Sequence, residues 1–450
     1  MKNYLLLLFA FFALFACRDD EFGGGNGALK PIDFSISVNY DPSFNALASS
    51  GATVVMTNTT TGDVYTKTTE NTGQANFTQI LPGNYTVTIN KKMTSAEFST
   101  LFGYVPQEVE VVFNATQENV KVSENVTSTA LVLKAGRVGD LVIKQIYYAG
   151  SHTRQGASFR DQFIEIYNNS NETIYADGLY IAQTYGKTNT TTNEYTLPSG
   201  QFDWSKSLKM TAGNAANTDY VYADYVIQIP GLGATYPIAP GQSFVIAATG
   251  VNHKAPLVDN QGDPLTVDNP ELTIDLSTAE FEVYLGDFRT SIGEAVFRSD
   301  IQNPSVMDVV IAYWGIPGYY SGNRDLLMDN LGRDSFVLFR ADNFDSFGAY
   351  TDPTILTVTS NSNYFKQIPQ SIIIDGVELQ HYNPNSQRPK HLSASIDAGS
   401  IHTDAAYNSQ SVIRKVKTTL SDGRKVLEDS NNSSNDFVIM QKAAPKEFAP

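Results

Sequence analysis

Aromatic residues gather at one place in the sequence where they could bind a ligand. Tyr313-Trp314-Gly315 and Gly318-Tyr319-Tyr320-Ser321-Gly322 lie among turn-forming residues and form the densest aromatic cluster of the chain. A tyrosine ring can pack against a ligand and still hydrogen-bond through its phenol, which suits a sugar. The opposing interpretation is that these rings cap a hydrophobic core. The residues that we predict to contact a ligand are Tyr313, Trp314, Tyr319 and Tyr320.

The histidines do not form a local metal motif, because no two of them share a strand face or a helical turn. His402 and Asp404 alternate onto one face if their segment is a strand, and Asp397 or His391 could complete a mixed nitrogen and oxygen site. Solvated polar side chains are the simpler interpretation. The five histidines are His152, His253, His381, His391 and His402.

Two acid-rich loops contain the oxygen ligands that calcium prefers. In Asp259–Asp263 the glycine stands in the wrong register for an EF-hand, and Asp429–Asp436 is similarly rich in oxygen ligands. Polar turns are the simpler interpretation of both loops. We therefore predict no metal site and no cofactor.

Known catalytic motifs are missing from the sequence. It contains no Gly-x-Ser-x-Gly elbow, His-Glu-x-x-His pair, phosphate-binding glycine loop or dinucleotide fingerprint. Two carboxylates for glycoside hydrolysis can be distant in the chain, because they need only be about 5 to 9.5 Å apart in space. Glu165 is the most conspicuous acid, and either an outward position or an ion pair with Arg414 is the preferred interpretation. We predict no catalytic residues, with an extracellular hydrolase as one alternative.

The first residues predict secretion and a lipid anchor. Lys2 precedes an apolar stretch from Leu5 to Ala16 that is too short to span a bilayer, which is typical of a signal peptide over residues 1–16. Leu14-Phe15-Ala16-Cys17 resembles the bacterial lipobox, in which the cysteine is acylated. Because each buried methylene contributes about 0.8 kcal/mol, we predict that acylated Cys17 anchors the protein in outer-membrane lipid.

Residues 17–31 form the predicted tether after the anchor. The glycine-rich run 23–27 favours a flexible chain. Arg18-Asp19-Asp20-Glu21 resembles the surface-export signal of Bacteroidetes lipoproteins, which implies that the protein faces the cell exterior. A merely solvated linker is the alternative interpretation.

The composition excludes several classes of protein. Among 450 residues, 31 Lys and Arg stand against 47 Asp and Glu, so the formal charge is −16 and nucleic acid is not an expected partner. Hydrophobic residues at 42% supply ample core material, which rules out wholesale disorder. The single cysteine excludes intrachain disulfides and thiolate metal sites.

Residues 32–135 predict a small β-sandwich. Apolar residues from Phe34 to Tyr40 recur with period two, as in a half-buried strand. Leu81-Pro82-Gly83-Asn84 predicts a type II turn with a positive φ at Gly83. Further strands are expected at Glu108–Phe113, Asn119–Val122 and Leu131–Leu133.

A series of short motifs in this region carries a family resemblance. Gly-Ala-Thr-Val, Thr-Gly-Asp, Gly-Gln-Ala-Asn-Phe and Leu-Pro-Gly-Asn-Tyr-Thr-Val follow one another between residues 51 and 88. The series resembles the carboxypeptidase-regulatory domain and the collagen-adhesin B repeat. The resemblance implies an immunoglobulin-like or prealbumin-like sandwich that acts as a stalk or spacer.

Residues 138–450 predict a second, larger β-sandwich with long insertions at 183–223, 250–275 and 341–410. Phe163-Ile164-Glu165-Ile166-Tyr167-Asn168 precedes an Asp-Gly turn with a strand, and later a Pro-Gly-Gln turn with an apolar strand. This order resembles the lamin-tail domain, an immunoglobulin-like sandwich. Function is expected in the insertions, because loops of that length exceed what a sandwich needs.

The sequence therefore predicts an all-β protein of two sandwiches that resembles Bacteroides lipoproteins with no assigned activity. We expect a non-catalytic, lipid-anchored cell-surface protein that acts in binding or assembly. The alternative is a lipoprotein that captures a glycan, metal complex or peptide for an outer-membrane transporter. The expected partners are outer-membrane lipid and, beyond it, a transporter, a glycan or a surface protein.

Overall fold

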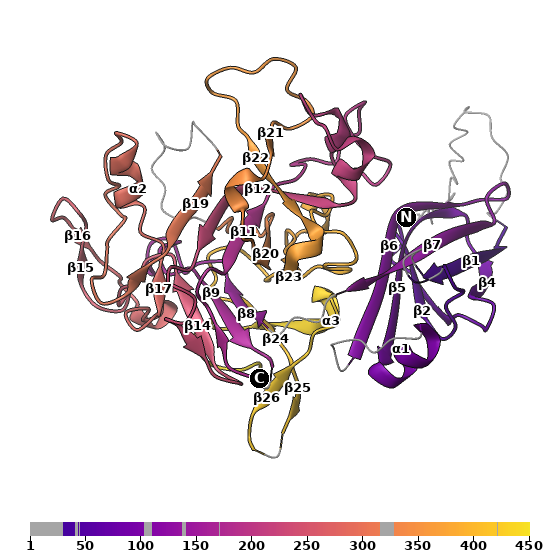
Figure 1. Ribbon diagram of the computed structural model, residues 1–450, viewed down its shortest axis with the longest axis horizontal. Helices are drawn as coiled ribbons and strands as arrows, with labels where there is room; N and C mark the ends of the chain where they lie inside the picture. The colour runs from indigo at the N-terminus through magenta and orange to yellow at the C-terminus, as the bar shows by residue number, and fades with distance from the viewer. Residues whose placement is uncertain are drawn as a thin grey trace, which may run out of the picture.

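The protein folds into two β modules that lie side by side (Figure 1). The all-β fold class is confirmed, because most of the regular secondary structure is β-strand and the α-helices are short. The computed structural model describes residues 30–40, 44, 46–102, 110–136, 141–170, 172–315, 328–420 and 422–450.

The N-terminal module is one seven-stranded sheet that folds over on itself, in the order β3-β2-β5-β6-β7-β1-β4. Side chains of β1 alternate between buried and half-buried as predicted, with Phe34, Ile36 and Val38 in the hydrophobic core. Its elements are β1 (Ile32–Tyr40), β2 (Thr53–Asn58), β3 (Val64–Thr68), β4 (Gln74–Ile80), β5 (Gly83–Thr94), α1 (Ser95–Phe102), β6 (Glu110–Val122) and β7 (Ser128–Gly136).

Two local predictions in this module are wrong. The strands expected at Glu108–Phe113 and Asn119–Val122 are parts of one long strand, β6, which continues past a positive φ of 56° at Asn119. Gly83 does not take a positive φ, because it already pairs with Val122 at the start of β5. The positive φ near this turn is at Gln79 instead, with a value of 59°.

The C-terminal module packs two further seven-stranded sheets face to face. The first runs β21-β22-β12-β11-β20-β23, with β19 paired to β12; the second runs β18-β17-β14-β9-β8-β24-β27. The first contains β11 (Tyr180–Thr184), β12 (Tyr220–Gln228), β19 (Val310–Trp314), β20 (Ser335–Phe339), β21 (Ala349–Tyr350), β22 (Phe365–Pro369) and β23 (Ile373–Glu378). The second contains β8 (Leu141–Tyr147), β9 (Phe163–Asn168), β14 (Ser243–Ala247), β17 (Phe281–Glu282), β18 (Met307–Asp308), β24 (Ser411–Arg414) and β27 (Phe437–Met440).

Short elements complete this module. Small ribbons and single helical turns connect the large sheets. The two-stranded ribbons are β10 (Ile174–Tyr175) with β13 (Pro237–Ile238), β15 (Leu257–Val258) with β16 (Pro264–Leu265), and β25 (Val416–Thr419) with β26 (Lys425–Leu427). The α-helices are α2 (Gly286–Ser291) and α3 (Ser433–Asp436), and the 3-10 turns are η2 (Trp204–Lys206), η3 (Gly213–Asn217), η4 (Pro270–Leu272), η6 (Phe344–Ser346), η7 (Gln370–Ile372) and η8 (Pro384–Ser386).

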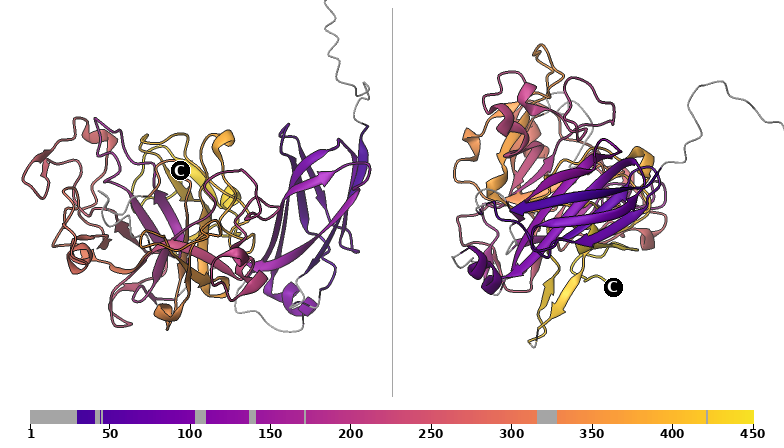
Figure 2. Two further views of the ribbon diagram at one scale, coloured as in Figure 1. Left: turned by 90° about the horizontal axis from the view of Figure 1, so that it is seen from above. Right: turned by 90° about the vertical axis from the view of Figure 1, so that its right-hand side faces the viewer.

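The region 341–410 is not a simple insertion. It contributes β22, which pairs with β12, and β23, which pairs with β20, so it completes the first sheet. The loops around these strands reach toward the N-terminal module (Figure 2). The segment therefore has a structural role in addition to any role in binding.

The predicted partner of Glu165 is wrong. Strands β8 and β9 are buried on both faces, and Glu165 on β9 pairs with Lys144 on β8, with 2.8 Å between Nζ and Oε1. Arg414 instead binds Asp375 at 2.7 Å and Asp429 at 3.2 Å. The strand register decides this outcome, because it places Glu165 beside Gln145 and thus next to Lys144.

Candidate functional site

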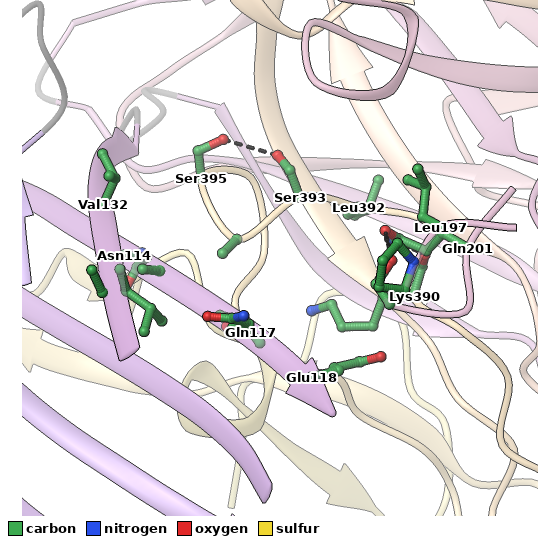
Figure 3. Close-up of a pocket in the computed structure, with 17 residues that line it drawn as sticks. Asn114, Gln117, Glu118, Val132, Leu197, Gln201, Lys390, Leu392, Ser393 and Ser395 are labelled. Atoms are coloured by element: carbon green, nitrogen blue, oxygen red, sulfur yellow. Dashed lines mark hydrogen bonds between the residues drawn. The ribbon is translucent and has the colours of Figure 1, made fainter. Parts of the chain in front are cut away.

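The main cavity of the candidate site lies between the two modules and measures about 520 Å³. The N-terminal module supplies residues 114–118 of β6 and 130–132 of β7, and the C-terminal module supplies residues 390–395 together with Leu197, Pro198, Ser199 and Gln201. Figure 3 shows side chains of both modules around this space. The C-terminal segments belong to the regions 183–223 and 341–410 in which the sequence predicted function.

Polar contacts join the modules around the cavity. Asn114 Nδ2 donates to the carbonyl of Ser430 at 3.1 Å, and Thr116 Oγ1 donates to the carbonyl of Ala398 at 3.2 Å. Lys92 Nζ forms a salt bridge of 2.8 Å with Glu428. These contacts set the position of β6 relative to the C-terminal loops.

The hairpin of β6 and β7 opens at the cavity. The two strands pair only from Val112–Gly136 to Asn114–Lys134, and they meet again at the turn where Ser123 bonds Val126. Between these points β7 pairs with β1 instead, from Ser128 to Leu133. The stretch of β6 that lines the cavity is therefore paired on one side only, with β5.

Glu118 is the acidic group of the cavity. Within the described residues its carboxylate has no hydrogen bond or salt bridge, although the side chain is half-buried. Burial raises the pKa of Glu118, while the charge of Lys390 lowers it and the charge of Glu378 raises it further. A ligand group that donates hydrogen bonds or carries a positive charge would find an acceptor here.

Lys390 lies opposite Glu118 but is held by the backbone. Its Nζ donates to the carbonyl of Asp397 at 2.6 Å and to the carbonyl of Gly399. The ammonium therefore fixes the loop 390–399 and contributes positive potential to the cavity. Ser393 and Ser395, whose hydroxyls are 2.9 Å apart, add further donors and acceptors on the same wall.

A second, polar space of about 220 Å³ adjoins the first. Thr116, Glu118 and Lys390 line both spaces, so the two form one groove between the modules. Threonine and serine hydroxyls dominate the second space, together with Arg388. Burial lowers the pKa of Arg388, and the charge of Arg333 lowers it further.

The predicted aromatic site is only partly within the described residues. Trp314 is buried in the main core and stacks on Tyr225 at 5.2 Å between ring centroids. Tyr313 is half-buried, and its phenol donates to the carbonyl of Tyr364 at 3.0 Å. Tyr319 and Tyr320 lie outside the described residues, as does Cys17. Ligand contact by the four aromatic residues stays a prediction.

The residues of the considered mixed metal site do not meet. His402 Nδ1 contacts the carbonyl of Thr403, and Asp404 accepts from Gln410 at 2.7 Å. Asp397 is buried against Ser433, and His391 lies against Ser335 and Thr184. In the part of the chain that the structure describes, no group of three His, Cys, Asp or Glu side chains is placed to hold a metal.

Arginine side chains occupy both acid-rich loops. Arg298 binds Asp259 and Asp263 in the first loop. Arg414 binds Asp429 in the second and lies 3.6 Å from Asp436. The carboxylates thus have cationic partners within the protein.

A second group of carboxyls stands at the end of the first sheet. Asp224 lies at an irregular step of β12 beside Gln183, whose Nε2 donates to it at 3.3 Å. Asp334 immediately precedes β20, on the other side of β11. Burial raises the pKa of Asp224 to about 7, and burial together with the charge of Asp224 raises the pKa of Asp334.

Sequence reasoning missed Glu118, Lys390, Asp224 and Asp334. No motif marks them, because each gains its environment from segments that are distant in the chain. The sequence indicated only the region of the site, because Lys390 and residues 197–201 lie in long segments without a clear strand pattern. The side chains themselves could not be selected from among many similar ones.

Comparison with known proteins gives a family match over part of the chain but no activity. Residues 239–444 match the model of a family described as "Protein of unknown function (DUF4876)". The chain is also similar to the crystal structure of a DUF4876 family protein from Bacteroides thetaiotaomicron, with 24% sequence identity and a TM-score of 0.51. That likeness covers 91% of this chain and 95% of the other, and it shows a shared fold. No curated protein matches.

The match to DUF4876 leaves several predictions untested. The resemblances to carboxypeptidase-regulatory, collagen-adhesin B and lamin-tail domains stay predictions, as do the lipid anchor and the outer-membrane location. None of the helices in the described residues is both long and apolar enough to span a bilayer.

Proposed function

We propose that this chain is a lipid-anchored, cell-surface binding protein that holds its ligand in the groove between its two β modules. The observation that carries the proposal is the carboxylate of Glu118, which has no partner among the described residues and lines a cavity of about 520 Å³. Ligand sites are typically about 300–1,000 Å³ and combine apolar walls with a few placed polar groups. Leu131, Leu197 and Leu392 supply apolar wall here, and Glu118 and the two serines supply the polar groups.

Filling the cavity tests this proposal. Ala394 lines the cavity, so Ala394→Trp should occupy it, whereas Ala96→Trp on the exposed face of α1 is a matched control. The purified protein is screened against glycans, peptides and metal complexes by calorimetry. We expect a ligand whose binding is lost in Ala394→Trp and kept in Ala96→Trp. A ligand that binds both variants equally would place the site elsewhere and contradict the proposal.

The location is part of the same proposal and has its own test. Acylation of Cys17 would leave the modules outside the membrane on a glycine-rich tether. We expect Cys17→Ala to move the protein from the membrane fraction to the soluble fraction. Replacement of Asp19, Asp20 and Glu21 by alanine should protect the protein from protease added to intact cells. Membrane retention of Cys17→Ala would contradict the anchor.

A hydrolase is the second candidate, and the carboxyls of Asp224 and Asp334 favour it. A group with a pKa near 7 can act as a general acid at neutral pH. Asp224→Asn should then abolish turnover of a polysaccharide or peptide substrate while Asp263→Asn leaves it unchanged. If no substrate is turned over by the wild type, the binding function stands and the hydrolase is excluded for that panel.

A further inference from the structure

We propose that the occupant of the groove is an extended, basic segment of a partner polypeptide, which adds as a strand to the free edge of β6. This inference rests on the proposed function and specifies its ligand. It starts from backbone groups, because the open β6–β7 hairpin leaves strand edges facing the cavity. Unpaired strand edges are templates for strand addition.

The register shows which groups of β6 are free. Successive residues of a strand direct their backbone groups alternately to the two neighbours. Thr59 N–H donates to Asn84 C=O, so even-numbered residues of β5 face β2 and odd-numbered residues face β6. Ala115 and Gln117 pair with these odd-numbered residues of β5. The N–H and C=O of Thr116 therefore point away from β5, toward β7.

The facing edge of β7 is free in the same way. Ser35 N–H donates to Thr127 C=O, so Thr127 and every second residue after it face β1. Ala130 and Val132 then face β6. Asn114–Lys134 is the last pair of the β6–β7 ladder. If the ladder continued for two more residues, it would pair Thr116 with Val132. Figure 3 shows Val132 and Gln117 on the two separate strands.

These free groups coincide with the cavity. Residues 114–118 and 130–132 are the parts of β6 and β7 that line it. A segment of five extended residues spans about 16 Å, which matches the length of β6 exposed there. An extended peptide can satisfy such groups, because its own N–H and C=O repeat at the same spacing.

The carboxylate of Glu118 favours a basic segment. It lines both joined spaces without a partner among the described residues, and the chain as a whole has a formal charge of −16. Two cations also line the groove: two backbone carbonyls hold the ammonium of Lys390, and the charges of Arg333, Asp329 and Asp334 act on Arg388. A lysine or arginine side chain of the added strand would therefore reach the carboxylate of Glu118.

The test uses defined peptides and the full-length protein in detergent. The probe is the acetylated and amidated hexapeptide (Thr-Lys)₃, measured by calorimetry. An analogue that is N-methylated at every residue keeps the charge but cannot donate backbone hydrogen bonds. (Thr-Glu)₃ keeps the backbone and reverses the charge. We expect the wild type to bind (Thr-Lys)₃ at least about tenfold more tightly than either analogue.

Variants locate the contact. Thr116→Pro removes an N–H that has no partner in the sheets, and edge positions tolerate proline. Thr116→Val also loses the hydroxyl bond to Ala398 but keeps the N–H, so (Thr-Lys)₃ should bind Thr116→Pro about tenfold or more weakly than it binds Thr116→Val. Glu118→Gln should reduce the preference for (Thr-Lys)₃ over (Thr-Glu)₃, and Glu124→Gln on the exposed turn is the matched control.

The outcomes separate this inference from the proposed function. Equal binding of (Thr-Lys)₃ and its N-methylated analogue would overturn strand addition, even if Thr116→Pro failed to fold. If maltohexaose binds the wild type and not Ala394→Trp while no peptide binds, the cavity is a ligand site for a glycan and the peptide inference is wrong. If Ala394→Trp weakens the binding of no ligand, both the proposed groove function and the peptide inference are contradicted.

Discussion

The two modules bury different kinds of side chain in their cores. In the N-terminal module, strand β1 buries one face, and the buried polar side chains among the described residues, Ser49, Asn58, Thr69 and Asn114, are uncharged. In the C-terminal module, β8 and β9 are buried on both faces and bring Lys144 and Glu165 into the interior. Buried charges therefore have to be compensated in the second module, whereas the first module buries uncharged side chains. The groove lies between the two modules.

The arginine at the centre of the second module should give the largest effect. Arg414 is fully buried and binds Asp375 and Asp429, with Asp436 nearby. Arg414→Met leaves these carboxyls without a cation, so we expect a loss of about 4 kcal/mol in the free energy of unfolding. Urea denaturation followed by circular dichroism measures it. A loss below about 1 kcal/mol would show that the carboxyls are compensated without Arg414.

A cavity created in the N-terminal module should lower the free energy of unfolding by less, and it should affect that module alone. Phe113 is fully buried, with ring centroids 4.8 Å from Tyr40 and 5.0 Å from Phe44. Phe113→Ala should destabilise the N-terminal module by about 3 kcal/mol, because it leaves a void among aromatic rings. Hydrogen exchange resolved by peptide should show the change in β1–β7 and not in β8 and β9. Equal loosening of both modules would mean that they unfold as one unit.

The half-buried carboxyl of Asp224 makes the second module sensitive to pH. Its pKa of about 7 lies above the unfolded value of 3.8, so the folded state keeps a proton that the unfolded state has released. This stabilisation is complete below pH 3.8 and is lost as the pH rises through 7. Asp224→Asn should therefore raise the melting temperature relative to wild type more at pH 8 than at pH 4. The same difference at both pH values would contradict a raised pKa.

The salt bridge between Lys92 and Glu428 should have the smallest effect on the free energy of unfolding. Lys92 and Glu428 are partly exposed, so solvent screens their attraction. Lys92→Ala should change the free energy of unfolding by less than about 1 kcal/mol. Small-angle scattering should report the same distance between modules for this variant and the wild type. A clear separation of the modules would show that this one contact holds the groove closed.

The sequence predicts individual strands well and their pairing poorly. Strand β1 follows directly from the alternation of Phe34 to Tyr40, and β9 from the apolar run around Glu165. The partner of Glu165 was not predictable, because only the β8–β9 register decides between Lys144 and Arg414.

The groove was hidden from sequence reasoning for the same reason. It exists because β7 leaves β6 and pairs with β1, and because two loops that are distant in the chain, at 197–201 and 390–395, contribute side chains to the gap. Local pattern indicates parts of β6 and β7 but neither their full length nor where their pairing ends. Glu118 could be selected as a candidate only from the structure, in which its carboxylate has no hydrogen bond or salt bridge among the described residues.

Residue-resolved hydrogen exchange tests the free strand edges of the groove most directly. Without a ligand, the account predicts fast exchange at the amides of Thr116, Ala130 and Val132, and slow exchange at Ala115 and Leu131, which bond to β5 and β1. Addition of (Thr-Lys)₃ should slow exchange at Thr116. Contradiction would come from amides of Thr116 and Val132 that are as protected as those of Ala115 and Leu131 before any ligand is added.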